Sequence, residues 1–319
     1  MGNYSAWWQV WGRGPSLLDH SRPELTAHQA NFKRVTNACT YSHKDLAGGL
    51  LWVLLFLSLW FVVTSQFLWA AACMAAFLGM VANNPIKVLY AASCLLTAWI
   101  RTPEFLPLEV HFPSHHLFLS PAVKCEILGF LAGTRLSPMQ AQFKGENNYL
   151  GGGGGGSDSA QWRFKLLKML GEYSPVVQLE MPTLFGALQV CPDVVSCAIS
   201  VLEPGVTVPM HVGYYKGLVR YMLPILVPRD FRGLWLNVNG LQKHWEEGKD
   251  FMWDDLYPHA VYNTTSETRV VLFMDIRRAQ LPAWLDRLNS AIIWIVNTSG
   301  MAAKEIRSNE TAQPIPASS

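Results

Sequence analysis

The 319-residue sequence has little charge, no closely spaced cysteine pairs and no basic stretch. Charged residues make up 15% of the chain, against about 25% in an average soluble domain, and the shortage is concentrated in one long segment, which excludes a wholly soluble or a mainly disordered chain. A net charge of +2 without a Lys/Arg stripe argues against a nucleic-acid partner. The six cysteines include no CxxC pair, so they indicate free thiols rather than a disulfide scaffold or a structural zinc site.

The shortage of charge is concentrated in residues 47–100, where Lys87 is the one charged side chain. Its uncharged part, 48–82, is longer than the about 20 residues that one spanning helix needs. We therefore expect a transmembrane region of two apolar helices, with three as the alternative. The expected location is an endomembrane such as the endoplasmic reticulum rather than the plasma membrane, and the side on which the following domain lies stays open.

Composition divides the chain into five expected segments. They are a polar and aromatic N-terminal segment (1–46), the transmembrane region (47–100), a globular domain (101–281), an amphipathic helix (282–298) and a disordered tail (299–319). Within the globular domain, a run of six glycines makes 151–159 a flexible loop, because glycine is costly to order. The amphipathic helix has the pattern of a helix that lies on a membrane surface.

Short β-rich segments dominate the second half of the globular domain. They are rich in β-branched and aromatic residues and are separated by Pro, Gly, Asn or Asp turns. The five segments are 196–202, 218–227, 233–238, 249–253 and 269–276. This spacing predicts a mainly β domain of the jelly-roll kind, with flanking helices such as 122–133.

Two of the nine histidines lie where they suit metal binding. His211 follows a Pro-Gly turn in EPGVTVPMHVG, and His259 begins a strand after Asp254-Asp255. Two neutral imidazoles in a barrel mouth are part of a non-haem Fe(II) site, whose third protein ligand is a carboxylate. That carboxylate usually stands two residues after the first histidine, where this chain has Gly213. Asp254 and Asp255 are the alternatives, either as the ligand or as residues that support it.

Arg269 stands ten residues after His259 at the start of an apolar strand. An arginine that enters an apolar barrel needs an anionic partner, because an unpaired buried charge is costly. A dicarboxylate cosubstrate would satisfy it through two parallel hydrogen bonds. The alternative is a surface ion pair with Glu267 or Asp275.

Residues 200–278 resemble the catalytic core of the aspartyl/asparaginyl β-hydroxylase family. The matching motifs are SVLEPGVTVPMHVG, LVRYMLPILVP, WEEGKDFMWDDLYPHAVYN and RVVLFMDIRR. The resemblance implies a double-stranded β-helix that uses Fe(II), 2-oxoglutarate and O₂. It makes His211 and His259 the iron ligands, with water in place of a carboxylate beside Gly213.

The same resemblance assigns the cosubstrate residues. Arg269 and Ser200 would hold the distal carboxylate of 2-oxoglutarate, and Arg220 would lie near its other end. The chain departs from the family at Met222, where the family often has a histidine donor.

The expected function is that of a membrane-anchored Fe(II)/2-oxoglutarate-dependent dioxygenase that hydroxylates an Asp or Asn side chain of a polypeptide. Its partners would be this substrate and the bilayer, with no nucleic acid. A hydroxylase of a lipid acyl chain is the first alternative, since members of the family act on both kinds of substrate. A non-catalytic, membrane-tethered β-helix binding module is the second.

Overall fold

The computed structural model describes residues 53–55, 57, 58, 60, 89, 92, 96, 100, 102–136, 162–211, 213, 215–310 and 313–314. The predicted N-terminal segment and glycine-rich loop lie outside these residues, as does most of the predicted transmembrane region. Within the described part of the chain, no helix combines the length and the apolar character that crossing a bilayer requires.

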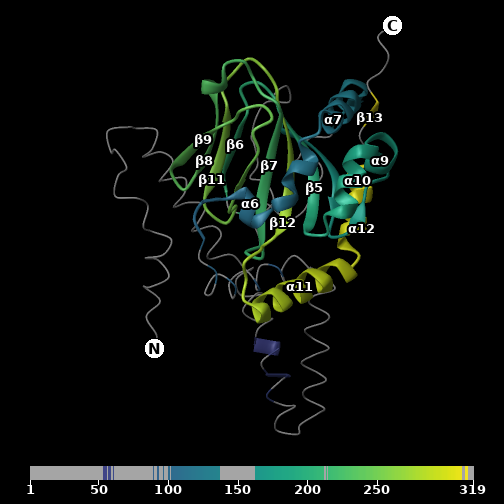
Figure 1. The fold of residues 1–319 in the computed structure, drawn as a ribbon, viewed down its shortest axis with the longest axis vertical. Helices are drawn as coiled ribbons and strands as arrows, with labels where there is room; N and C mark the ends of the chain where they lie inside the picture. Colours follow the sequence, from purple (N-terminus) through teal and green to yellow (C-terminus); the bar gives the residue numbers. More distant parts are fainter. Residues whose placement is uncertain are drawn as a thin grey trace.

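Eight consecutive strands build a jelly roll from two antiparallel sheets (Figure 1). They are β5 (Val194–Leu202), β6 (Thr207–His211), β7 (Leu218–Leu226), β8 (Leu234–Val238), β9 (Leu241–His244), β10 (Phe251–Trp253), β11 (His259–Asn263) and β12 (Arg269–Arg277). The chain passes repeatedly between the sheets, so one holds β10-β7-β12-β5 and the other β6-β11-β8-β9. The prediction of a mainly β jelly roll is confirmed.

Shorter strands extend the larger sheet at both edges. β1 (Phe105–Leu106) pairs with β10 at one edge, and β3 (Trp162–Met169) and β4 (Glu172–Tyr173) follow β5 at the other. A separate small sheet joins β2 (Thr134–Arg135) to β13 (Gln313–Pro314).

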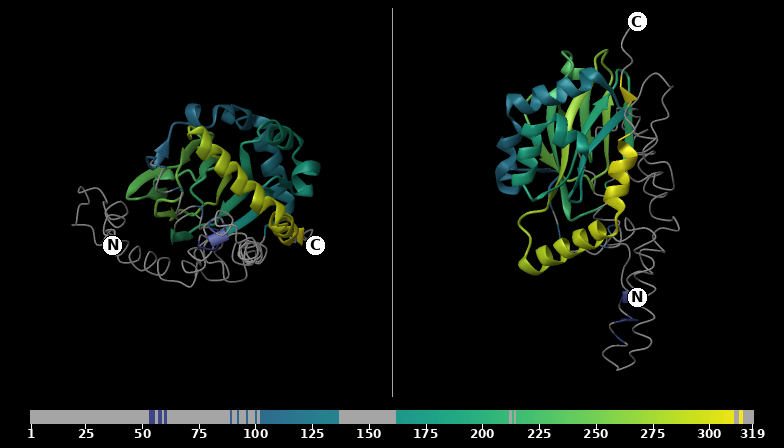
Figure 2. Two further views of the ribbon diagram at one scale, coloured as in Figure 1. Left: turned by 90° about the horizontal axis from the view of Figure 1, so that it is seen from below. Right: turned by 90° about the vertical axis from the view of Figure 1, so that its right-hand side faces the viewer.

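Helices cover the outer face of the larger sheet (Figure 2). They are α6 (Leu108–His111), the 3₁₀ helix η1 (Pro113–Phe118), α7 (Pro121–Gly133), α9 (Pro175–Glu180) and α10 (Pro182–Val190), and a 3₁₀ turn, η2 (Phe231–Gly233), precedes β8. Along β12, Val270 and Leu272 pack towards these helices, whereas Val271 and Phe273 pack towards the second sheet. This alternation of period two leaves the inner face of the sheet to line the space between the sheets.

The C-terminal region corrects one prediction. After α11 (Ala283–Thr298), the tail predicted to be disordered instead forms a second helix, α12 (Met301–Asn309). Gly300 separates the two helices in a left-handed conformation, with φ of 73°. Ala302 and Ile306 are buried on one face of α12, and Asn309 accepts a hydrogen bond of 2.6 Å from the Leu166 amide of β3. The polar composition of the tail hid this short apolar face, which is why disorder was predicted.

Candidate functional site

A cavity of about 90 Å³ lies between the sheets of the jelly roll. Its walls come from both sheets, including β3 of the larger sheet. The lining residues are Trp162, Phe164, Leu166, Met169, Leu170, Val195, Ser196, Ser200, Val208, His211, Arg220, Met222, Trp253, His259, Val261, Arg269, Phe273 and Asp275. All five residues predicted for the site are among them, so the fold brings together side chains from distant parts of the sequence around one cavity.

The two histidines face each other across neighbouring strands. His211 ends β6 and His259 begins β11, and the two are direct partners in the antiparallel register. Their ring centroids lie 4.0 Å apart. This pairing explains how residues so distant in sequence converge.

Hydrogen bonding and burial give His259 the state that a metal requires. Its Nδ1 atom lies 2.8 Å from the carbonyl oxygen of Tyr257, so an N–H at this atom donates to the carbonyl and leaves the Nε2 lone pair available. Burial, and next the neighbouring His211, hold the pKa of His259 well below its usual value. A neutral imidazole at neutral pH follows.

Gly213 leaves no room for a third ligand at its position. A Cβ atom placed there would lie 2.4 Å from the Cγ and Oδ2 atoms of Asp255. The amide of Gly213 also donates a hydrogen bond of 2.6 Å to the Asp255 carbonyl. Among the described residues, no group of three or more His, Cys, Asp or Glu side chains is arranged to hold a metal ion.

Arg269 is a buried cation without a carboxylate partner among the described residues. Its side chain is 2% exposed, its Nη2 donates to Ser200 Oγ at 3.3 Å, and its Nε has no acceptor. Burial lowers its pKa to about 9, which still leaves the guanidinium charged at neutral pH. The alternative of a surface ion pair is wrong, because Glu267 pairs with Arg229 and Asp275 with Arg220.

Ser200 is held in place by two donors. Its Oγ accepts from Arg269 and from the indole Nε1 of Trp162, at 2.9 Å. The hydroxyl proton is therefore left to donate to whatever lies in the cavity. Trp162 begins β3, and nothing in the sequence pattern marked it as part of the site.

Arg220 lines the cavity but is already paired. Its guanidinium contacts Asp275 Oδ1 at 2.9 Å and Asp255 Oδ2 at 3.2 Å, and Asp275 also accepts a hydrogen bond from Ser196. Burial raises the pKa of Asp255 to about 6, although Arg220 opposes this rise. The predicted contact of Arg220 with a cosubstrate stays a prediction. In the described structure, the Arg220 guanidinium forms ion pairs with two carboxylates.

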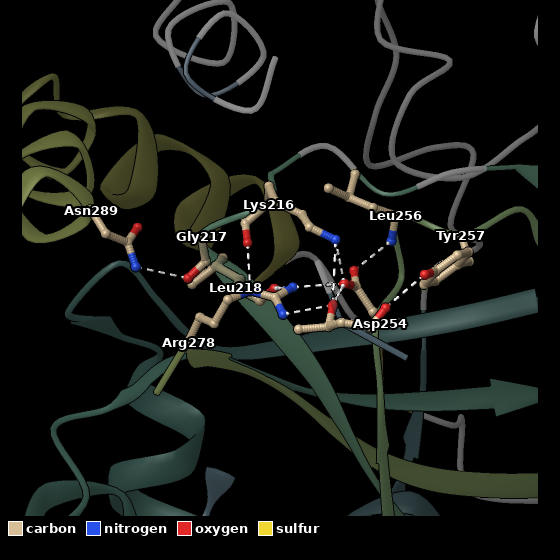
Figure 3. A network of polar contacts seen from close by, with 9 residues as sticks. Lys216, Gly217, Leu218, Asp254, Leu256, Tyr257, Arg278 and Asn289 are labelled. Carbon is tan, nitrogen blue, oxygen red and sulfur yellow. Dashed lines mark hydrogen bonds and ion pairs between the residues drawn. The ribbon is translucent and has the colours of Figure 1, made fainter. Parts of the chain in front are cut away.

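A buried polar network, whose residues do not line the cavity, fixes the loop that precedes His259 (Figure 3). Asp254 is fully buried and its Oδ2 contacts Lys216 at 2.6 Å and Arg278 at 2.9 Å. Thr102 donates to the same oxygen at 2.6 Å. Burial alone would raise the pKa of Asp254, but the two cations lower it below its ordinary value. Asp254 is thus a structural anchor of this loop rather than a metal ligand.

The same region ties α11 to the segment after His211. Asn289 of α11 donates to the Gly217 carbonyl at 2.9 Å, as Figure 3 shows, and accepts from Tyr215 at 2.6 Å. Sequence reasoning did not find these contacts, since Asn289 lies in a helix whose pattern suggested only amphipathicity.

Comparison with known proteins shows which families and proteins this chain is similar to. Residues 123–279 match the model of the family described as Aspartyl/Asparaginyl beta-hydroxylase. The ornithine lipid ester-linked acyl 2-hydroxylase of Rhizobium tropici is 35% identical over 119 residues, which cover 37% of this chain and 42% of that protein. The aspartyl/asparaginyl beta-hydroxylase of Homo sapiens is 29% identical over 82 residues, 26% of this chain and 11% of that protein.

The chain therefore matches less than half of the length of either curated relative. Among solved structures, the cupin domain of Schizosaccharomyces pombe Cnp3 aligns with 8% identity and a TM-score of 0.24 over 30% of this chain and 61% of that chain. The fold assignment accordingly comes from the strand pairing described above. With the matched motifs, the facing histidines and the family model in agreement, residues 123–279 of this chain belong to the aspartyl/asparaginyl β-hydroxylase family.

Proposed function

We propose that this chain is an Fe(II)- and 2-oxoglutarate-dependent hydroxylase. The observation that carries the proposal is the buried, unpaired guanidinium of Arg269 in the same cavity as the facing His211 and His259. A buried cation without a counter-ion is costly, and a carboxylate of the cosubstrate would neutralise it. The proposal is supported by the relatives of this chain, which are named as hydroxylases.

The residues that line the cavity fit both Fe(II) and 2-oxoglutarate. His211 and His259 would hold Fe(II), because one ring nitrogen of His259 is fixed by the Tyr257 carbonyl and the other is free to bind. Arg269 and Ser200 would hold the far carboxylate of 2-oxoglutarate by charge and by two hydrogen-bond donors. When bound, iron and cosubstrate together activate O₂ for insertion of oxygen into a C–H bond. The aromatic and aliphatic side chains of the lining would limit the access of water to that position once a substrate is bound.

For the substrate, the cavity favours a lipid acyl chain over an Asp or Asn side chain. Its wall beside β3 is apolar, formed by Phe164, Leu166, Leu170 and Val195. Recognition of a carboxylate or an amide would need a further polar partner, but Arg269 is used for the cosubstrate and Arg220 is paired with two acids. Hydroxylation of a polypeptide therefore becomes the second candidate, supported by the human relative.

Helix α11 supports contact with a bilayer. Trp284 and Trp294 are 52% and 65% exposed, and they share a helical face with the exposed Arg287 and Ala291. Tryptophan is enriched at the membrane–water interface, and arginine can keep its charge in water beside it. We expect this face to lie on the lipid surface, with an endomembrane as the expected location.

The opposite face of α11 leads towards the cavity. Leu285 and Ile292 pack there in one cluster with Leu96 of the largely apolar segment 47–100. Leu170 and Val195 belong both to this cluster and to the cavity wall. This cluster therefore connects the buried face of α11 with the apolar wall of the cavity, which supports an apolar substrate.

The test is an anaerobic titration of the detergent-solubilised full chain with Fe(II) and 2-oxoglutarate. The visible charge-transfer band of the chelate is expected in the wild type and lost in His259→Ala and Arg269→Ala. His244→Ala and Arg229→Ala are matched controls outside the cavity and should retain it. A wild type without the band would overturn the proposal. Succinate release and gain of one oxygen atom are then compared between phospholipid vesicles and Asp- or Asn-containing peptides, and turnover with the peptides alone would replace the acyl substrate.

A further inference from the structure

Trp253, the last residue of β10, carries a buried hydrogen-bond donor without an acceptor. Its indole Nε1 has no partner among the described residues, and its side chain is 1% exposed. The residue lines the cavity. Because native proteins seldom leave a buried donor unsatisfied, the missing acceptor is expected to come from a molecule that occupies the cavity.

The position of the indole identifies the part of the cavity concerned. Its ring packs edge-on against His259, with centroids 4.4 Å apart at 78°. In the sheet register, Trp253 pairs with Arg220, and Arg220 with Asp275 near the end of β12. Arg269 stands at the beginning of the same strand. The indole therefore lies at the histidine end, away from the cation that would hold the far carboxylate.

The neighbours of Trp253 on this inner face do not supply the acceptor. Phe251 of β10 pairs with Met222 of β7, whose thioether is only a weak acceptor. Arg220, directly opposite Trp253, is itself a donor and directs its guanidinium at Asp275 and Asp255. An oxygen-bearing ligand that arrives beside His259 would thus meet the indole N–H of Trp253.

We propose that Trp253 donates its Nε1–H to the carboxylate oxygen of 2-oxoglutarate that lies beside the histidine pair. This inference rests on the proposed function, because it takes 2-oxoglutarate as the occupant. It assigns the cosubstrate one anchor at each end, Arg269 with Ser200 at one and Trp253 at the other.

Trp253→Phe removes the N–H and keeps an aromatic ring against His259. With Fe(II) bound under anaerobic conditions, the dissociation constant of 2-oxoglutarate is read from the charge-transfer band and, independently, from calorimetry. We expect it to rise roughly tenfold to a hundredfold, the range for loss of a hydrogen bond to a charged group. The band maximum should also shift, since the donor acts on the chelating end.

Trp235→Phe is the matched control. Trp235 of β8 stacks on Tyr262, with centroids 4.9 Å apart, and does not line the cavity, so its replacement should leave the dissociation constant unchanged. Near-ultraviolet circular dichroism shows whether each variant is folded. If Trp253→Phe fails to fold, Trp253→Tyr, which also lacks the indole N–H, takes its place.

The outcomes separate the inference from the function on which it rests. A normal band with unchanged affinity in folded Trp253→Phe overturns the role of Trp253 and leaves the hydroxylase proposal standing. A higher Michaelis constant for the substrate with unchanged cosubstrate affinity also overturns it, because the acceptor would then belong to the substrate. Absence of any band in the wild type overturns both.

Discussion

Replacing Gly213 by alanine tests whether the Asp255 carboxyl occupies the space next to Gly213. The new Cβ would lie 2.4–2.5 Å from three atoms of that carboxyl, where 3.4 Å or more is ordinary contact. Either the overlap is relieved by movement of Asp255, which breaks its contact with Arg220, or the loop shifts. Overpacking of this kind costs about 1–3 kcal/mol, and each kcal/mol lowers the Tm of a domain of this size by about 2–4 °C.

The assay is thermal unfolding of the purified full chain, followed by circular dichroism. Gly186→Ala in α10 is the matched control, because a Cβ there meets no atom within 4 Å and alanine favours a helix. Asp255→Ala, which removes the clashing atoms, should rescue Gly213→Ala, so that the double variant is more stable than the two single effects predict. Equal Tm values for Gly213→Ala and Gly186→Ala would refute the reasoning, and so would strict additivity in the double variant.

Three further predictions concern buried charge and the exposed helix. Arg269→Met should raise the Tm of the cosubstrate-free protein, because it removes an unpaired buried cation, and should abolish the Tm increase on adding 2-oxoglutarate; a lower Tm would contradict this. Burial lowers the pKa of Lys165 below 10.5, so between its lowered pKa and 10.5 the unfolded chain binds more protons than the folded chain. The free energy of unfolding should therefore rise with pH up to about 10.5. Urea denaturation should show this rise in the wild type and a smaller one in Lys165→Met. With p-benzoylphenylalanine in place of Trp294, irradiation in vesicles should yield lipid adducts, whereas the same probe at Leu241 of β9 should not; equal labelling would contradict the membrane-facing role of α11.

The sequence predicted the strands that are apolar on both faces and missed those that are not. β5, β7 and β12 are almost wholly buried and appeared as β-branched runs. β6 and β9 were not predicted, because β6 is short and contains a proline, and the residues of β9 are mostly exposed. Helix α12 was missed for a related reason: its stability depends on packing against β3 rather than on its own composition.

The sequence predicted the role of a site residue where that role follows from its neighbours in the sequence. It did not predict roles that depend on partners far along the chain. The need of Arg269 for an anion followed from its apolar strand, and the structure confirms that it is buried. The roles of Trp162 and Asp254 did not follow, because their partners are 38 residues away in one case and 24 to 152 in the other. Only the fold shows that Asp254 binds Lys216 and Arg278 while its neighbour Asp255 faces Arg220.

The two arginines of the cavity make it electrically one-sided. Arg220 is neutralised by Asp255 and Asp275, whereas Arg269 keeps its full charge within apolar walls. An incoming dicarboxylate is therefore attracted most strongly to the Arg269 end, where one of its carboxylates would be held before any metal bond forms. Because Arg220 is paired with two carboxylates, Arg269 is the stronger anion-binding end of the cavity.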